Sequence, residues 1–331
     1  MARKIGSTLL FCLGTLGLVL VGTSSGHAAK PGEGLTVCIS LDKMDSPSRD
    51  GQVKLWKAEA ADIGMKLILQ VAGEDAQRQS AQVDTCIAQK VAGIVSIPWD
   101  TQAVLQDIDR AHEAHIPFAG IDQLPAEKDS IDFFSGADPH ADGMHAAERL
   151  ISLIGDKPTK VVDLQGALDQ VNGQQRDQGF KDGIKSHPNI KIVSEIPTNW
   201  HPEPVLAGME NALLANPDIG AVFVASDGLL PPIWSALKKV NRYVKVGEPN
   251  HVIVLSIDGD PQGCQSVRDG YMDGGYAQPF ADMTLAALQA IIELHDGKTL
   301  DEAHKVKLIP SYQYTPSDFA TTKSKVWGCA Q

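Results

Sequence analysis

Short β-prone apolar runs alternate with helix-forming segments through most of this sequence. In the first half we expect strands at 35–41, 65–71, 93–97 and 116–121, separated by helices at 52–63, 75–89 and 101–114. The first of these helices has apolar residues at helical spacing and is followed by Gly64, which suits a helix C-terminus. Strands joined by helices through short connections predict a parallel sheet covered on both faces.

The same alternation starts again near residue 143. We expect helices at 143–154, 174–187, 204–215 and 233–240, and strands at 160–164, 190–196, 220–225 and 251–257. Two α/β units of similar size predict two lobes in this chain of 331 residues. No Pro/Ser-rich linker separates the units, so we expect short crossings between them.

The first 29 residues have the pattern of an export signal. Arg3 and Lys4 precede an apolar run, and small residues that suit signal peptidase follow it. A membrane anchor is the alternative, but the run is short for a span and a polar, small-residue stretch follows. We therefore expect residues 1–29 to be a cleaved signal peptide.

Four cysteines lie beyond the expected signal: Cys38, Cys86, Cys264 and Cys329. An even number in an oxidising compartment indicates two disulfides, with buried free thiols as the alternative. Four cysteines permit three connectivities, which sequence alone does not distinguish. If the chain has two lobes as above, Cys38 with Cys86 and Cys264 with Cys329 are the favoured pairs.

Charge and motif content argue against several classes of function. The formal net charge of -12 makes nucleic acid an unfavourable partner. The chain has no G-x-S-x-G, G-x-x-x-x-G-K-[ST] or H-E-x-x-H motif, and no G-x-G-x-x-G after the first strand. A carboxylate pair for glycoside hydrolysis stays an open alternative, but nothing singles out an acid and a nucleophile. We expect no enzymatic activity, no cofactor and no metal.

Polar and aromatic side chains follow the expected strands at their carboxyl ends, where open parallel sheets bind ligands. Carboxylates and amides hydrogen-bond hydroxyl groups, and indole rings cover the C–H faces of a sugar. This set therefore predicts a site for a neutral polyhydroxylated ligand. Its members include Asp42, Lys43, Trp99, Asp122, Gln123, Gln165, Asn199, Trp200, Ser226, Asp227 and Asp258.

Several short motifs, taken in order, carry a resemblance to a known family. They are Gly93–Asp100, Ile116–Asp122, Val161–Gly166, Arg176–Phe180, Ala221–Asp227, Ile257–Gly259 and Ala277-Gln278. The chain resembles the type 1 periplasmic solute-binding proteins of the ribose/galactose-binding class, over roughly residues 35–310. The resemblance implies a periplasmic α/β protein with two Rossmann-like lobes, parallel sheets and a three-segment hinge. The implied lobes are 30–136 plus 279–309, and 137–278 plus 310–331.

The resemblance also implies ligand contacts. Asp122 would accept from hydroxyl groups, Arg176 would donate in bidentate fashion, and Trp200 would stack on the ligand. The remaining implied polar contacts are Ser226, Asp227, Asp258 and Gln278, and the first strand adds Asp42 and Lys43. The family's usual Asn-Pro-Phe-Phe stretch is absent, and a longer charged segment, 42–50, replaces it. Trp99 is a candidate substitute for one of the missing rings.

By this resemblance the chain is a receptor that captures a monosaccharide, polyol or cyclitol. We expect a monomer, because nothing in the sequence indicates an interface. The receptor would deliver that ligand to an ABC permease in the inner membrane. Alternatives are a protein that presents its ligand to a chemoreceptor or a sensor kinase, and a binder of a small molecule outside the sugars. The altered segment 42–50 keeps the choice of ligand open.

Overall fold

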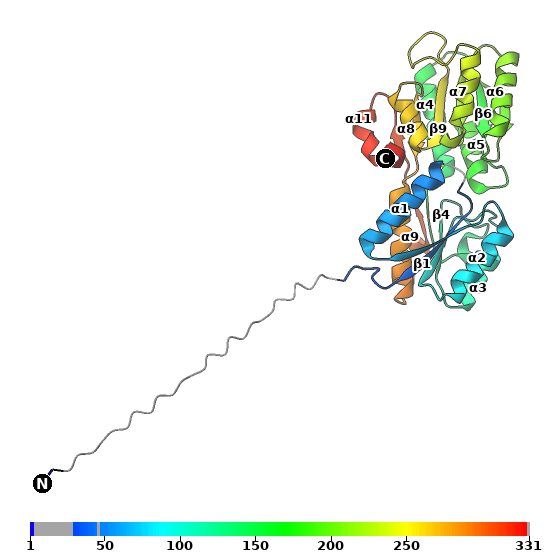
Figure 1. Cartoon of the computed structure of the whole chain (residues 1–331). Helices are drawn as coiled ribbons and strands as arrows, with labels where there is room; N and C mark the ends of the chain where they lie inside the picture. Colours follow the sequence, from blue (N-terminus) through cyan, green and yellow to red (C-terminus); the bar gives the residue numbers. More distant parts are fainter. Residues whose placement is uncertain (3–28, 45–46, 330–331) are drawn as a thin grey trace.

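The chain forms two α/β lobes, as seen in Figure 1; the computed structural model describes residues 1–2, 29–44 and 47–329. The expected signal peptide, 1–29, lies almost entirely outside these residues. Within the described residues each lobe has one six-stranded sheet. The sheet of the N-terminal lobe is parallel throughout, in the order β11 (Val306–Leu308), β5 (Phe133–Gly136), β4 (Phe118–Ile121), β3 (Gly93–Ser96), β1 (Thr36–Leu41) and β2 (Lys66–Val71).

The sheet of the C-terminal lobe repeats this arrangement with one antiparallel edge strand. Its order is β12 (Tyr312–Tyr314), β10 (Gly274–Ala277), β9 (Ile253–Asp258), β8 (Ile219–Val224), β6 (Thr159–Gln165) and β7 (Ile190–Pro197), and only the β12–β10 pairing is antiparallel among the described pairs. Central strands such as β3 and β8 are buried almost throughout, as expected for parallel strands with helices on both faces.

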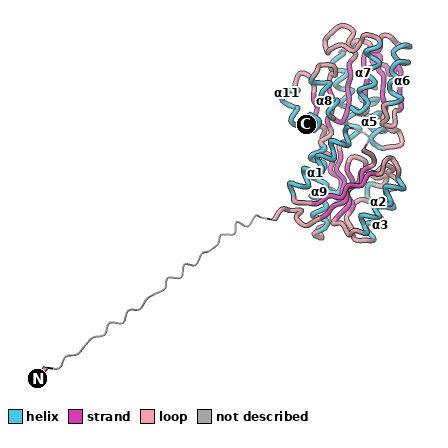
Figure 2. Tube along the Cα trace, viewed as in Figure 1, coloured by secondary structure: helices cyan, strands magenta, loops and turns pink. Residues whose placement is uncertain are grey.

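Helices cover both faces of each sheet, as the tube in Figure 2 shows. In the N-terminal lobe, α1 (Pro47–Ile63) and α9 (Phe280–His295) cover one face, and α2 (Ala76–Ala88) and α3 (Val104–Glu113) cover the other. In the C-terminal lobe, the faces carry α4 (Pro139–Ile154) with α5 (Val171–Ile184), and α6 (Glu203–Ala215) with α7 (Leu230–Lys239) and α8 (Pro261–Arg268). Among the described residues, no helix combines the length and apolar character needed to cross a membrane.

The chain passes between the lobes three times. It leaves the N-terminal sheet after β5, returns between β10 and α9, and crosses again between β11 and β12. Two short helices flank this third crossing. The helix α10 (Glu302–Lys305) precedes β11, and α11 (Phe319–Thr322) follows β12. The C-terminal segment then contacts both lobes, since Trp327 packs on Phe280 of α9 and donates to the carbonyl of Asp258 at 2.8 Å.

The expected α/β class is confirmed, and local capping explains several boundaries. Asp75 accepts from the amide of Arg78 at 3.0 Å and begins α2, while Gly64 takes a φ of 81° after α1. One boundary differs from the expectation: the helix expected at 52–63 begins at Pro47 as α1, so the end of the charged segment 42–50 is helical. Proline is well suited to the first turn of a helix, where its missing N–H is not needed.

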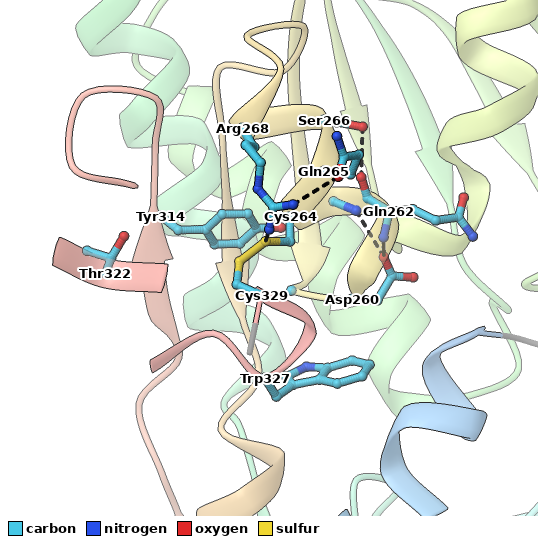
Figure 3. Close-up of a disulfide and its surroundings, with 12 residues drawn as sticks. Asp260, Gln262, Cys264, Gln265, Ser266, Arg268, Tyr314, Thr322, Trp327 and Cys329 are labelled. Atoms are coloured by element: carbon cyan, nitrogen blue, oxygen red, sulfur yellow. Dashed lines mark hydrogen bonds between the residues drawn. A yellow bond between two sulfur atoms is a disulfide. The ribbon is translucent and has the colours of Figure 1, made fainter. Parts of the chain in front are cut away.

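Both expected disulfides are present. Cys38 on β1 pairs with Cys86 on α2, and Cys264 on α8 pairs with Cys329 near the C-terminus. Figure 3 shows the second bond beside Tyr314 and Trp327, with the Arg268 side chain at Cys264. This bond fixes the C-terminal segment to the lobe that contributes α8.

Candidate functional site

A cavity of about 510 Å³ lies between the lobes, at the carboxyl ends of the strands of both sheets. The N-terminal lobe contributes residues that follow β1 and β4, together with the first turns of α1 and α9. The C-terminal lobe contributes the start of α5 and residues that follow β7, β8 and β9. The strand ends therefore converge as expected for open parallel sheets.

Most of the residues expected to bind ligand line this cavity. They are Asp42, Lys43, Asp122, Arg176, Trp200, Ser226, Asp258 and Gln278. Trp99, Gln165, Asn199 and Asp227 do not belong to the lining. The structure thus brings together side chains from both lobes, while their contacts with a ligand remain predictions.

An arginine joins two carboxylates in the wall formed by the N-terminal lobe. Arg49 Nε and Nη2 donate to the two oxygens of Asp42 at 2.9 and 2.7 Å, a bidentate arrangement. Arg49 Nη1 donates to Asp122 at 3.1 Å and to Gln52 at 2.7 Å. Burial alone would lower the pKa of Arg49, but the charges of Asp42 and Asp122 raise it above its usual range. This wall is polar where two aromatic rings are usual in the family that the sequence resembles.

The wall formed by the C-terminal lobe is built around Asp258. Arg176 Nη1 lies 3.1 Å from Asp258 Oδ1 and donates to the carbonyl of Ala225 at 2.8 Å. Ser226 and Gln278 donate to the two oxygens of Asp258 at 2.5 and 2.8 Å. Arg176 Nε is buried and has no hydrogen-bond partner among the described atoms, so this wall holds a further donor. These contacts fix the orientation of the Asp258 carboxylate before any ligand arrives.

Trp200 is held in place from several directions. Its φ is 63°, a conformation that is uncommon for a bulky residue, and its amide donates to Thr198 Oγ1 at 3.1 Å. The ring lies against the backbone of Gly166, where a Cβ atom would be 2.1 Å from the indole. Arg176 Cζ lies 5.8 Å from the ring centroid. The packing therefore requires glycine at 166 and fixes a ring that lines the cavity.

Asp227 lies behind the cavity wall rather than in the lining, and the ligand contact expected for it stays a prediction. It is fully buried, and its Oδ2 accepts from the amides of Gly259 and Asp260 at 2.8 and 2.9 Å and from Tyr314 at 3.1 Å. Burial, together with the nearby carboxylates, raises the pKa of Asp227 well above its ordinary value. Asp227 therefore orients the loop that follows β9, next to the cavity wall.

Trp99 is not part of the lining, but its backbone is hydrogen-bonded to residues of both lobes. Its amide donates to Gln79 at 2.8 Å, and its carbonyl accepts from Gln170 at 3.2 Å. The stacking role expected for its ring stays a prediction. Phe280, at the start of α9, is the aromatic residue of that lobe in the lining.

Sequence reasoning missed several lining residues. The missed polar residues include Arg49, Gln52, Gln170, Asn172 and Gln262, whereas Gln123, expected among the strand-end residues, lines the cavity. Asn172 donates to the carbonyl and to Oδ1 of Asp122, both at 3.1 Å, and so joins the two lobes. Pro47, followed by a polar run compatible with a helix, could have indicated an earlier helix start that includes Arg49 and Gln52.

One acidic group away from the cavity has the composition of a cation site. Asp163, Asp177 and Glu195 bring carboxylate oxygens within 4.8 Å of one another. Lys181 Nζ already lies 2.9 Å from Asp177 and 2.7 Å from Glu195. Burial, and hydrogen bonding to Asp177, raise the pKa of Asp163 well above its ordinary value. Lys181 therefore already places a positive charge between two of these three carboxylates.

Comparison with known proteins gives consistent matches over most of the chain. A family model described as "Periplasmic binding protein domain" matches residues 37–299. The ribose import binding protein of Bacillus subtilis is 25% identical over 267 residues, covering 81% of this chain and 84% of the relative. The D-allose-binding periplasmic protein of Escherichia coli is 24% identical and covers 93% of this chain and 98% of the relative.

Solved structures share the fold at lower identity. A solute-binding protein from Actinobacillus succinogenes with bound D-allose has a TM-score of 0.80 at 23% identity, covering 86% of this chain and 99% of that one. A solute-binding protein from Bacillus halodurans with bound myo-inositol has a TM-score of 0.79 at 21% identity, covering 90% and 100%. These likenesses extend over both lobes.

Proposed function

The chain belongs to the periplasmic binding protein family, and from that premise we propose that it is a solute-binding receptor for a small polyhydroxylated ligand. The ligand class is a monosaccharide, polyol or cyclitol, held between the lobes and delivered to an ABC permease. The family consists of binding proteins, and we infer that this chain catalyses no reaction. Relatives named for ribose and D-allose binding support the ligand class.

One observation carries the proposal: both walls of the cavity present carboxylates whose orientation is already fixed. In the N-terminal lobe Arg49 holds Asp42 and Asp122, and in the C-terminal lobe Arg176 contacts Asp258. Carboxylate oxygens accept from hydroxyl groups, and the Trp200 ring offers a face for C–H groups. A ligand that bridges both walls favours the closed arrangement, since closure follows from the higher affinity of the closed state.

We infer the remaining properties from the same premise. The signal at 1–29 would be removed on export, leaving a monomer that works in the periplasm. Two disulfides are consistent with an oxidising compartment. The lobes would comprise 30–136 with 279–309, and 137–278 with 310–331. Near each of these boundaries the chain passes from one sheet to the other.

A thermal-stability screen tests the ligand class. The mature protein is unfolded and refolded to remove any ligand carried through purification, and is then screened against pentoses, hexoses, polyols, cyclitols and a non-sugar set. A compound at about a hundred times its dissociation constant adds about 2.7 kcal/mol of stability. We expect one polyhydroxylated class to respond. Stabilisation by non-sugar compounds alone would contradict the proposal.

A pair of variants connects the response to the cavity. Asp258→Asn should lose most of the stabilisation, because it removes a charged acceptor from the cavity wall. Asp218→Asn is the matched control, since Asp218 is exposed and pairs with Lys160 outside the cavity. Delivery to a permease is tested with a candidate ABC transporter in proteoliposomes, whose ATPase activity should rise when ligand-loaded receptor is added.

A further inference from the structure

Gln170 occupies an unusual position for a glutamine. It is the residue that precedes α5 and is only 7% exposed. Short side chains such as Ser, Asp or Asn are favoured there, because they accept from the first amides of the helix. The Gln170 side chain makes no such capping bond. Its amide instead lies between the two lobes.

Three hydrogen bonds converge on this amide. Gln170 Oε1 accepts from Trp200 Nε1 at 2.7 Å and from Gln123 Nε2 at 3.1 Å. Gln170 Nε2 donates to the carbonyl of Trp99 at 3.2 Å. An indole N–H can only donate and a carbonyl can only accept, so these partners determine which end of the amide carries oxygen. The chemistry therefore specifies an amide, with one acceptor end and one donor end.

Two of these partners belong to the other lobe. Gln123 follows β4 and Trp99 follows β3, both in the N-terminal sheet, whereas Trp200 and Gln170 belong to the C-terminal lobe. The bonds to Gln123 and Trp99 are lost when the lobes separate, while the bond to Trp200 is made within one lobe. We propose that Gln170 is a positioning residue that couples closure of the lobes to the orientation of the Trp200 ring in the cavity.

This inference rests on the proposed function, since it gives the closed arrangement of a binding protein a specific internal contact. Gln123 extends the connection to the cavity, because it is part of the lining and its Oε1 is buried without a partner among the described atoms. A ligand hydroxyl that donates to Gln123 would therefore be connected through Gln170 to the ring. Closure and stacking are then one event rather than two.

Cross-linking measures closure without any ligand. Glu74 of the N-terminal lobe and His201 of the C-terminal lobe approach to 3.6 Å at the edge of the cleft. Both are replaced by cysteine, and the rate of cross-linking by a short bismaleimide reports how often the lobes are closed. Gln170→Ala should slow this rate by about fivefold or more, the effect of losing one or two hydrogen bonds. Gln170→Glu should also slow it, because a carboxylate oxygen then faces the Trp99 carbonyl.

The same substitutions at Gln174 are the matched controls. Gln174 lies one turn further along α5 and is exposed, and its side-chain bond to the carbonyl of Leu168 is made within the C-terminal lobe, so Gln174→Ala and Gln174→Glu should leave the rate unchanged. Equal rates for the Gln170 and Gln174 variants would overturn the role in closure. Circular dichroism confirms that each variant is folded before it is compared.

A spectroscopic readout separates coupling from simple destabilisation. In a Trp99→Phe background, Trp200 is the most accessible tryptophan, since Trp56, Trp234 and Trp327 are 0%, 9% and 6% exposed. Acrylamide quenching should rise most in Gln170→Ala, which removes the acceptor of the indole N–H and weakens closure, and should rise less in Gln170→Glu, which weakens closure but keeps an acceptor for the indole. Unchanged quenching in Gln170→Ala would refute the coupling.

The two proposals fail separately. If no sugar, polyol or cyclitol stabilises the protein while the Gln170 variants still slow cross-linking, the proposed ligand class fails and the coupling stands. If ligands bind but the cross-linking and quenching results match those of the Gln174 variants, the proposed function stands and the coupling fails.

Discussion

Replacing Arg49 with alanine gives the most direct test of how the cavity wall is built. The side chains of Arg49, Asp42 and Asp122 are only 10%, 8% and 6% exposed, so removing the guanidinium leaves two largely buried carboxylates without their shared cation. Breaking a buried ion pair by removing one partner costs about 3–5 kcal/mol. We expect Arg49→Ala to lower the free energy of unfolding by about that amount at neutral pH, measured by urea denaturation.

An exposed ion pair supplies the control. Lys298 and Glu293 lie 3.4 Å apart with side chains 62% and 46% exposed, and such pairs contribute about 1 kcal/mol or less. Lys298→Ala should therefore change stability little. If Arg49→Ala proves no more destabilising than Lys298→Ala, the buried ion pairs of Arg49 with Asp42 and Asp122 do not stabilise this wall.

Two further variants identify the cause of the loss. Arg49→Lys keeps the charge but cannot bond both oxygens of Asp42 in parallel, so its stability should fall between those of the wild type and Arg49→Ala. Adding Asp42→Asn to Arg49→Ala removes one uncompensated charge and should recover part of the loss. A double variant with the summed cost of both single changes would show no coupling between these residues.

Three other predictions follow from the structure. Arg176→Ala should weaken binding of whichever screened compound responds by about 2–3 kcal/mol in calorimetry, because Asp258 loses its charged partner, and unchanged affinity would exclude Arg176 from the site. Burial raises the pKa of Asp142 to about 7, so the folded state keeps a proton that the unfolded state releases, and stability falls as the pH rises from about 4 to 7. Asp142→Asn should therefore stabilise the protein more at pH 8 than at pH 5, by up to about 3 kcal/mol, and an equal effect at both pH values would contradict this. Replacing both Cys264 and Cys329 with alanine opens a loop with a sequence separation of 65 and should cost up to about 4 kcal/mol in urea unfolding, whereas an unchanged midpoint would show that the bond adds no stability.

The sequence predicts the sheets well because their signal is local. Buried parallel strands such as β3 and β8 are short apolar runs, and the helices between strands have apolar residues at helical spacing. The same reasoning found the cavity, because strand ends in a parallel sheet share one edge. The disulfide pairs followed once each cysteine could be assigned to a lobe. These features depend on neighbours along the chain or on a rule of topology.

The unpredicted parts depend on contacts between distant residues. Arg49 reaches Asp122 across 73 positions of sequence, and Gln170 reaches Trp99 across 71. Asp227 and Asp258 both stand near strand ends, yet only Asp258 lines the cavity, because the Asp227 carboxylate is directed at the amides that follow β9. Which way a strand-end carboxylate is directed depends on the loop that packs against it. Spacing in the sequence does not report that loop.

Both walls of the cavity use an arginine to hold a carboxylate, and this has a consequence for binding. A carboxylate that is already held by a guanidinium loses little further freedom when a hydroxyl donates to it, so the cost of ordering the site is met during folding. The polar wall formed by Arg49 offers less aromatic surface than Trp200 and Phe280 offer elsewhere in the lining. Ligand recognition must therefore depend more on hydroxyl positions than on stacking along that wall. Because the two walls belong to different lobes, those hydrogen bonds are complete only when the lobes are closed, which makes the ligand itself the link that favours closure.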